Sequence, residues 1–231
     1  MNILITAGGT QEKIDQVRSI TNTSTGKTSL GLAEFLFEHG YEDIFFVHAQ
    51  KAPSFPQAKQ NVEFVSSDDL DKKLKHILSS YDIDVVIHAA AVSDFTVDKV
   101  VINGELFDPE KLNKISSLDE VELILKRRSK IIEQLKSYSR KPHPLVIGFK
   151  LTNTPEEQEQ RNQTLKLALS ENVDFVVHND LGSIHGTKHA SHIYFKDQLM
   201  FQGNTKLDMY KNIERILQLY TFNTSNKENY S

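Results

Sequence analysis

Cysteine is absent from the 231 residues of this chain, which excludes disulfides, thiolate metal sites and a cysteine nucleophile. No apolar run approaches the roughly 18 residues that a membrane-spanning helix requires. The first ten residues, MNILITAGGT, lack the basic segment that opens a signal peptide. Positive charge is not in excess either, because 27 Lys and Arg face 31 Asp and Glu for a net charge of −4. Nothing here indicates a nucleic-acid or anionic-membrane partner, and we expect a cytoplasmic protein.

The composition is that of a globular protein. Hydrophobic residues make up 39% of the chain and charged residues 25%, both close to the globular average. A chain of this length can bury a sizeable core. No repeat or shift in composition divides it, so we predict a single domain over residues 1–220, followed by a polar C-terminal tail over residues 221–231.

Short apolar runs alternate with amphipathic segments along the chain. The apolar runs predict strands over residues 2–7, 44–47, 62–65, 84–91, 145–151 and 173–177. The amphipathic segments predict helices over residues 26–38, 67–81, 119–137, 155–171 and 206–220. An Asn103-Gly104 pair predicts a hairpin flap over about residues 97–113, and a second hairpin is predicted over residues 191–201. This alternation predicts an α/β fold with a doubly wound, mostly parallel, Rossmann-like sheet.

In such a sheet, ligands bind beyond the carboxyl ends of the strands. The loops that follow the predicted strands are therefore the candidate site, and they span residues 7–27, 89–95, 148–153 and 178–182. The predicted flap begins at the same edge as the second of these loops. It is placed either to cover the site or to reach a second subunit.

Two motifs in these loops suggest other phosphate or nucleotide sites. Residues 24–28 (STGKT) end like a phosphate-binding P-loop, but Thr21 stands where that motif needs glycine. What remains is a helix N-terminus beside Lys27, an arrangement that favours an anion. Gly8-Gly9 after the first strand suggests dinucleotide binding, although the full G-x-G-x-x-G is missing and no acidic residue closes the second strand. An NAD(P)-dependent reductase and a non-catalytic nucleotide-binding regulator therefore stay as alternatives.

Three histidines near the C-terminal hairpin form a candidate metal site. His185, His189 and His192 lie in the segment HGTKHASH, whose glycine and small polar residues are typical of a surface loop. No carboxylate stands nearby at ligand spacing, so solvated histidines fit this segment better than a zinc site.

Four segments together are more specific than any one motif. They are GGT at 8–10 with IDQVRSITNTSTGK at 14–27, AAAVSDF at 89–95, KISS at 114–117, and GFK at 148–150 with NDL at 179–181. In this order and spacing the chain resembles phosphopantothenate–cysteine ligase (phosphopantothenoylcysteine synthetase) of coenzyme A biosynthesis. The likeness runs over residues 1–220 and is to the stand-alone bacterial form of that family.

The resemblance implies a reaction in two steps. CTP transfers its nucleotidyl group to the carboxylate of 4′-phosphopantothenate and pyrophosphate leaves. L-cysteine then attacks the acyl-nucleotide, which gives 4′-phosphopantothenoyl-cysteine and CMP. A carboxylate resists attack by an amine, so its oxygen must first become part of a good leaving group. Cations and Mg²⁺ are needed to neutralise the phosphates while the two anions meet.

The same resemblance implies roles for residues that match the family motifs. Asn22, Arg18 and Lys114 are the implied catalytic group, with Asn22 and Arg18 near the activated acyl group and Lys114 facing the triphosphate. The residues implied to bind phosphopantothenate are Gly8, Gly9, Ser24, Gly26, Lys27 and Asn179. The residues implied to bind the nucleotide are Ala90, Asp94, Ser129, Lys130, Ile131, Ile132 and Phe149.

Some positions depart from the family pattern. Many CTP-using members carry two lysines at i and i+4 in the helix before the last strand, where this chain has Leu167 and Glu171, with Lys150 and Lys166 nearby. We expect CTP rather than ATP as the nucleotide, although this departure bears on that choice. Family members are homodimers in which the flap region contributes to the partner's site, so the resemblance implies the same here. The sequence indicates neither the metal ligands nor a general base for the cysteine amine.

Overall fold

A computed structural model describes residues 1–117 and 120–228 of the chain. Its α-helices are α1 (Lys27–Glu38), α2 (Ser67–Ser80), α3 (Leu135–Tyr138), α4 (Glu157–Ala168) and α5 (Lys206–Glu228). Short 3-10 helices are η1 (Pro109–Lys111), η2 (Ile131–Glu133) and η3 (Leu181–Ser183). The strands of the central sheet are β1 (Ile3–Ala7), β4 (Ile44–Ala49), β5 (Gln60–Phe64), β6 (Val85–His88), β10 (Leu145–Thr152), β11 (Phe175–Asp180), β14 (Ser191–Phe195) and β15 (Gln198–Gly203). The outlying strands are β2 (Gln11–Lys13), β3 (Ser19–Thr21), β7 (Phe95–Ile102), β8 (Glu105–Phe107), β9 (Val121–Arg127), β12 (Ile184–His185) and β13 (Lys188–His189).

Within the described residues, the central sheet has eight strands in the order β15-β14-β11-β10-β6-β1-β4-β5. The strands from β11 to β5 are parallel, and β14 and β15 add an antiparallel hairpin at one edge. Val85 at the start of β6 lies level with Ile3 on one side and Leu145 on the other. Helical crossovers cover both faces of a parallel sheet, which is why β1, β4 and β6 are buried along their length, whereas the edge strand β5 alternates between exposed and at least partly buried residues. The predicted doubly wound, mostly parallel fold is confirmed.

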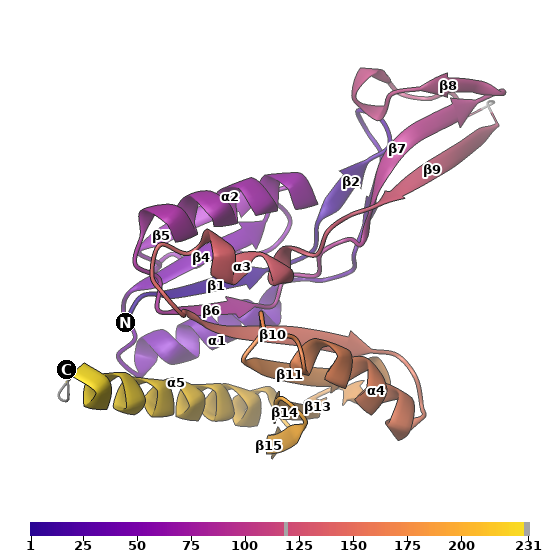
Figure 1. Ribbon diagram of the computed structural model, residues 1–231. Coiled ribbons are helices and arrows are strands. Elements are labelled where there is room, and N and C mark those ends of the chain that lie inside the picture. The colour runs from indigo at the N-terminus through magenta and orange to yellow at the C-terminus, as the bar shows by residue number, and fades with distance from the viewer. Residues whose placement is uncertain (118–119, 229–231) are drawn as a thin grey trace.

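Two hydrophobic layers hold the helices on the sheet. On one face, Leu36 of α1 and Ile213 of α5 belong to the cluster that contains Ile5 of β1. On the other face, Leu74 of α2 packs in the cluster of Val86 together with residues of α3 and α4. Figure 1 shows the two helical layers on opposite sides of the sheet. None of the helices in the described part of the chain is both long enough and apolar enough to cross a membrane.

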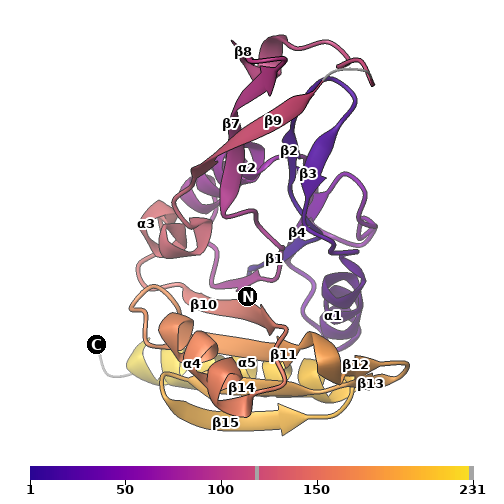
Figure 2. The ribbon, with the colours of Figure 1, turned by 90° about the vertical axis from the view of Figure 1, so that its right-hand side faces the viewer.

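The flap, which we define as β7, β8 and β9, projects from the sheet at the side to which the parallel strands point (Figure 1). Asn103 and Gly104 form its tight turn with φ angles of 50° and 86°, as the Asn-Gly pair predicts. Val97, Val100 and Ile115 form a small separate core there. Figure 2 shows β2 and β3 beside the flap, and side chains of that hairpin region pack against this core.

The prediction of a helix over residues 119–137 is wrong for most of that range. Residues 121–127 form β9, which pairs antiparallel with β7, and a single helical turn, α3, remains at Leu135–Tyr138. Val121, Leu123 and Leu125 alternate with other side chains at the spacing of a strand, and the edge of β7 supplies the partner. Residues 118–119 lie outside the described residues. Pairing with a neighbour has overridden local propensity here.

The last helix is longer than predicted. α5 runs from Lys206 to Glu228, so it continues past the predicted end at Tyr220 and into the expected polar tail. Met209, Ile213, Ile216 and Leu217 are buried against the sheet. This packing fixes the helix before the polar segment begins, and the polar residues then extend it. Residues 229–231 lie outside the described residues.

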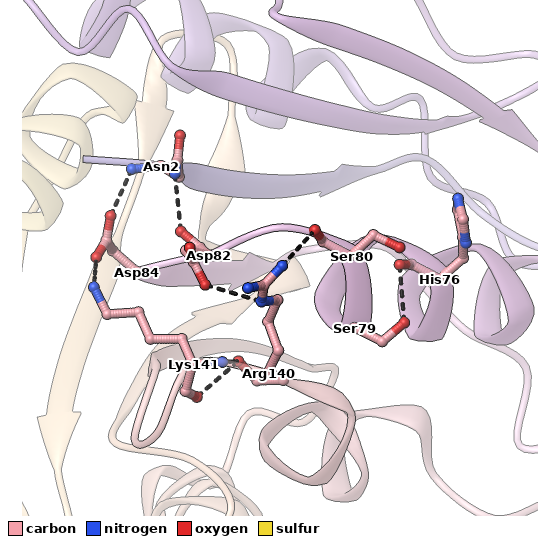
Figure 3. A network of polar contacts seen from close by, with 9 residues as sticks. Asn2, His76, Ser79, Ser80, Asp82, Asp84, Arg140 and Lys141 are labelled. Atoms are coloured by element: carbon pink, nitrogen blue, oxygen red, sulfur yellow. Dashed lines mark hydrogen bonds and ion pairs between the residues drawn. The ribbon is translucent and has the colours of Figure 1, made fainter.

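A network of polar contacts joins the chain segments at the amino ends of the strands (Figure 3). The Asn2 backbone N–H donates to Asp84 Oδ2 at 2.7 Å, and Asn2 Nδ2 donates to the Asp82 carbonyl at 2.9 Å. Arg140 pairs with Asp82 at 3.1 Å, and Lys141 pairs with Asp84. The hydrogen bond to Asp84 raises the pKa of Lys141. This network lies at the end of the sheet opposite the carboxyl ends, so it stabilises the scaffold without entering the candidate site.

Candidate functional site

The loops after β1 and β6 meet at the carboxyl ends of their strands. Gly9 pairs with Ala91 as in a parallel ladder, with the Ala91 N–H donating to the Gly8 carbonyl at 2.8 Å and the Thr10 N–H donating to the Ala91 carbonyl at 3.1 Å. Thr10 Oγ1 accepts from the Ser93 N–H at 3.0 Å. The two loops, GGT and AAAVSD, are therefore one hydrogen-bonded unit, as the rule for parallel sheets predicts.

Asn22 reaches this unit from the segment after β3. A Cβ atom on Gly9 would lie 2.2 Å from the Asn22 carbonyl oxygen, so only glycine allows the backbone of Asn22 to come this close. Asn22 is half-buried, and its Nδ2 makes a long contact of 3.5 Å to the Val92 carbonyl. A contact of that length leaves the amide hydrogens available to a ligand.

A cleft of about 620 Å³ opens beside this unit, between the ends of β6 and β10 and helix α4. The predicted site residues that line it are Asn22, Ala90, Asp94, Ser129, Lys130, Ile131, Ile132 and Phe149. All of the residues predicted to bind the nucleotide are thus in one cleft, together with Asn22. Ser129 and Lys130 are exposed, whereas Ile131 is buried at the start of η2.

The cleft carries an excess of positive charge. Lys130, Lys150 and Lys166 line it, against the carboxylates of Asp94 and Glu133. Leu167, which stands where many family members have lysine, also lines the cleft, whereas Glu171 does not. Lys150 and Lys166 therefore supply charge at the cleft from positions that the i, i+4 pattern does not single out. An anionic ligand is the class that such a set of side chains suits.

The residues predicted to bind phosphopantothenate are not in this cleft. A Cβ on Gly26 would lie 2.7 Å from Ala52 Cβ and 3.2 Å from the Gly8 backbone nitrogen. Gly8 and Gly26, with φ angles of 87° and 72°, therefore let β1 and the start of α1 pack closely. Lys27, which opens α1, is exposed and Ser24 is half-buried. The N-cap residue of this helix, Gly26, has no side chain to cap it, and the Lys27 N–H makes only a long contact of 3.5 Å to Thr25 Oγ1.

Asn179 at the end of β11 is buried, and its Nδ2 donates to the Ala190 carbonyl at 2.7 Å. Its neighbour Asp180 accepts from Thr152 Oγ1 at 2.7 Å and from the Gly182 N–H at 2.9 Å. Burial raises the pKa of Asp180, but these donors outweigh it and hold the pKa below its ordinary value. The polar groups at the end of β11 are thus hydrogen-bonded within the protein, and the side-chain nitrogen of Asn179 already has a partner.

Arg18 and Lys114 lie at the base of the flap rather than in the cleft. Arg18 donates to the Ile115 carbonyl at 2.8 Å and pairs with Asp15 at 3.5 Å. Asp15 also accepts from the N–H groups of Val17, Arg18 and Ile115. Burial raises the pKa of Asp15, but these backbone donors and Arg18 bring it below its ordinary value. Asp15 and Arg18 thereby fix the segment that carries the exposed Lys114.

The three histidines of the candidate zinc site do not form one. His185 contacts the Gly182 carbonyl at 2.6 Å, His189 is buried, and the ring of His192 lies 6.0 Å from that of His178. Across the described ranges, 1–117 and 120–228, no three His, Asp or Glu side chains gather in a way that would hold a metal ion. His189 and His192 are partly or fully buried instead of solvated.

Nearly the whole chain matches a known family. A family model described as the DNA/pantothenate metabolism flavoprotein C-terminal domain matches residues 1–218. The chain belongs to this family. Its resemblance to the ligase family, based on four short segments, is thereby confirmed at the level of the domain.

Relatives of this DNA/pantothenate metabolism flavoprotein C-terminal domain occur in longer proteins. The coenzyme A biosynthesis bifunctional protein CoaBC of Methanocaldococcus jannaschii is 32% identical over 180 residues, which are 78% of this chain and 40% of that protein. The CoaBC protein of Bacillus subtilis is 33% identical over 181 residues, again 78% of this chain and 40% of that protein. The chain thus spans about two fifths of the length of these curated relatives.

A solved structure matches the domain over nearly its full length. The crystal structure of the DNA/pantothenate metabolism flavoprotein from Streptococcus pneumoniae superposes with a TM-score of 0.82 at 31% sequence identity. The superposition covers 95% of this chain and 99% of that one. The flap and the central sheet therefore belong to a shared architecture.

Proposed function

We propose that this domain is a phosphopantothenate–cysteine ligase that uses CTP and forms an acyl-nucleotide intermediate. The observation that carries the proposal is the cleft, which brings together Asn22, residues 90–94 of the AAAVSD loop and three lysines. The proposal is supported by the relatives, whose name places them in coenzyme A biosynthesis.

In the first step, an oxygen of the phosphopantothenate carboxylate attacks the α-phosphorus of CTP, and pyrophosphate leaves. In the second, the amine of L-cysteine attacks the acyl carbon, and CMP leaves with the carboxylate oxygen. Lys130, Lys150 and Lys166 neutralise the triphosphate, which is the largest electrostatic demand of the first step. The Asn22 amide donates to the acyl oxygen on which charge develops.

Mg²⁺ accompanies the triphosphate in this proposal. It is commonly held by one or two carboxylates together with substrate phosphates and water, and the cleft supplies Asp94 and Glu133 for that purpose. When bound, the ion would add positive charge at the phosphates. The lysines and Asn22 position the reactants in either case.

A direct assay tests the function. The protein is mixed with Mg²⁺, 4′-phosphopantothenate and either CTP or ATP, with and without L-cysteine. We expect pyrophosphate release that depends on phosphopantothenate and is faster with CTP, and CMP formation once cysteine is added. No turnover with either nucleotide would remove the ligase. Nucleotide binding without pyrophosphate release would favour the non-catalytic regulator.

We infer that the active form is a homodimer in which each flap serves the partner's cleft. The flap exposes large apolar side chains, including Phe95 at 48%, Leu106 at 64% and Leu125 at 46% of their surface. Exposed apolar surface of this kind is typical of an interface. Lys114 does not line the cleft of its own chain. In the dimer that we infer, the Lys114 of one chain would reach the cleft of the other chain.

Mixing two inactive variants tests the exchange of flaps. In a heterodimer of Asn22→Ala and Lys114→Gln, one cleft would combine the intact Asn22 with the intact Lys114. Random pairing in a two-fold dimer should then restore about a quarter of the wild-type turnover. Turnover that stays at the level of the separate variants would show that each chain supplies its own lysine.

A further inference from the structure

Thr6 and His88 lie side by side on neighbouring strands of the sheet, and both are buried. Thr6 Oγ1 is 3.1 Å from His88 Nδ1. The same hydroxyl oxygen is 3.0 Å from the backbone nitrogen of Ala89 and 3.0 Å from that of Ala90. Thr6 is therefore the anchor of the loop that leads from β6 into the cleft.

These contacts decide where the imidazole proton of His88 resides. A hydroxyl has one proton to donate and two lone pairs that accept. Two backbone N–H groups, which only donate, occupy both lone pairs of Thr6. The hydroxyl proton must then go to His88 Nδ1, which accepts it and is unprotonated, so the proton of the neutral ring is on Nε2. Burial lowers the pKa of His88 to about 4, in agreement with a neutral ring near pH 7.

Of the two ring nitrogens of His88, Nε2 is the one left for a ligand, because Nδ1 contacts Thr6. His88 is one of the residues that line the cleft. Among the described residues, the side-chain contact of the ring is made through Nδ1. Nε2 does not belong to the buried nitrogen atoms that lack a hydrogen-bond partner, so it is not enclosed in the core without one. The structure thus presents a neutral donor of fixed orientation to whatever occupies this part of the cleft.

The surroundings indicate which part of a nucleotide this donor meets. Gly148 of β10 lies level with His88, and a Cβ there would lie 2.7 Å from Ile132 Cδ1 and 3.5 Å from Leu167 Cδ2. The side of the cleft next to His88 is therefore apolar. A phosphate prefers the lysines, whereas an aromatic ring with one or two neutral acceptor atoms suits apolar walls and a neutral donor.

We propose that His88 is a specificity-determining residue: its Nε2–H, oriented by Thr6, donates to an acceptor atom on the ring of the bound nucleobase. The proposal rests on the nucleotide-dependent function proposed above. Thr6 is then a positioning residue, since it acts on the ligand only through the imidazole.

Calorimetric titration of the whole protein with Mg²⁺·CTP and Mg²⁺·ATP tests the contact. For the nucleotide that the wild type binds, His88→Leu should raise Kd about tenfold, which is the change in affinity expected from the loss of one hydrogen bond. His88→Gln, whose amide nitrogen reaches the place of Nε2, should retain affinity within about threefold. His76→Leu on the exposed side of α2 is the matched control and should leave Kd unchanged, as should His88→Leu for phosphopantothenate.

The outcomes separate this inference from the proposed function. If the wild type binds a nucleotide and His88→Leu binds it equally well, the base contact is wrong and the ligase proposal stands. If the folded wild type binds neither nucleotide, the proposed function fails first. The ¹⁵N chemical shifts of the His88 ring give a readout that needs no ligand. We expect Nδ1 unprotonated and Nε2 protonated at pH 7, and a proton on Nδ1 would overturn the assignment.

Discussion

Replacing Asn22 with alanine is expected to lower the ligase turnover number by about 10²- to 10³-fold, the usual effect of removing one donor to a developing oxyanion. Asn22 lines the cleft, and its amide makes only a long contact with the Val92 carbonyl. Little structure depends on the side chain, so the protein should remain folded. The effect should appear in kcat, because the acyl oxygen gains charge only as the reaction proceeds.

Initial rates of pyrophosphate release, with CTP and phosphopantothenate varied in turn, measure this effect. Asn162→Ala is the matched control, since Asn162 is exposed on α4 and its Oδ1 accepts from Gln158 on the same exposed side. The control should keep wild-type kcat and KM. An Asn22→Ala variant with wild-type turnover would show that Asn22 does not act on the reacting atoms.

Replacing Gly9 with alanine is expected to lower the ligase turnover number by at least about 100-fold and also to destabilise the fold. The new Cβ would lie 2.2 Å from the Asn22 carbonyl oxygen, which is a backbone atom that cannot rotate away. Either the segment of Asn22 or the Gly9–Ala91 pairing must shift, and a displacement of about 1 Å at a site is enough for a loss of this size. Overpacking of this kind typically costs about 1–3 kcal/mol of the free energy of unfolding.

Urea unfolding and steady-state kinetics of the Gly9→Ala variant check both effects. Gly40→Ala is the control, because a Cβ there meets nothing within 4 Å and the strain of its φ of 88° is the sole penalty. That variant should lose stability by about 1–2 kcal/mol and keep full turnover. Normal turnover in Gly9→Ala would show that the close approach of Asn22 is not needed for catalysis.

The two parts of the site differ in how well local patterns predict them. The nucleotide group follows strand ends, and the ends of parallel strands must meet at one edge, so Ala90, Asp94 and Phe149 lie together as expected. Arg18 is different, because its motif match implies a contact with the intermediate. In the structure its guanidinium donates to the Ile115 carbonyl, 97 residues away in the sequence. No spacing rule anticipates a partner at that separation.

The apolar runs by themselves predicted the parallel strands, since a strand covered on both faces is hydrophobic along its length and this pattern needs no knowledge of neighbours. The short motifs determined the family for a similar reason: their residues are consecutive. Only the tertiary structure decided that residues 121–127 form a strand, because the edge of β7 is the partner that makes them one. The protonation that we infer for the His88 ring likewise rests on tertiary structure, because it follows from three hydrogen bonds to the hydroxyl of Thr6, which lies 82 residues from His88 in the sequence. The local periodicity of a sequence predicts which side chains are buried, whereas the partners of a hydrogen bond depend on which segments meet in the folded chain.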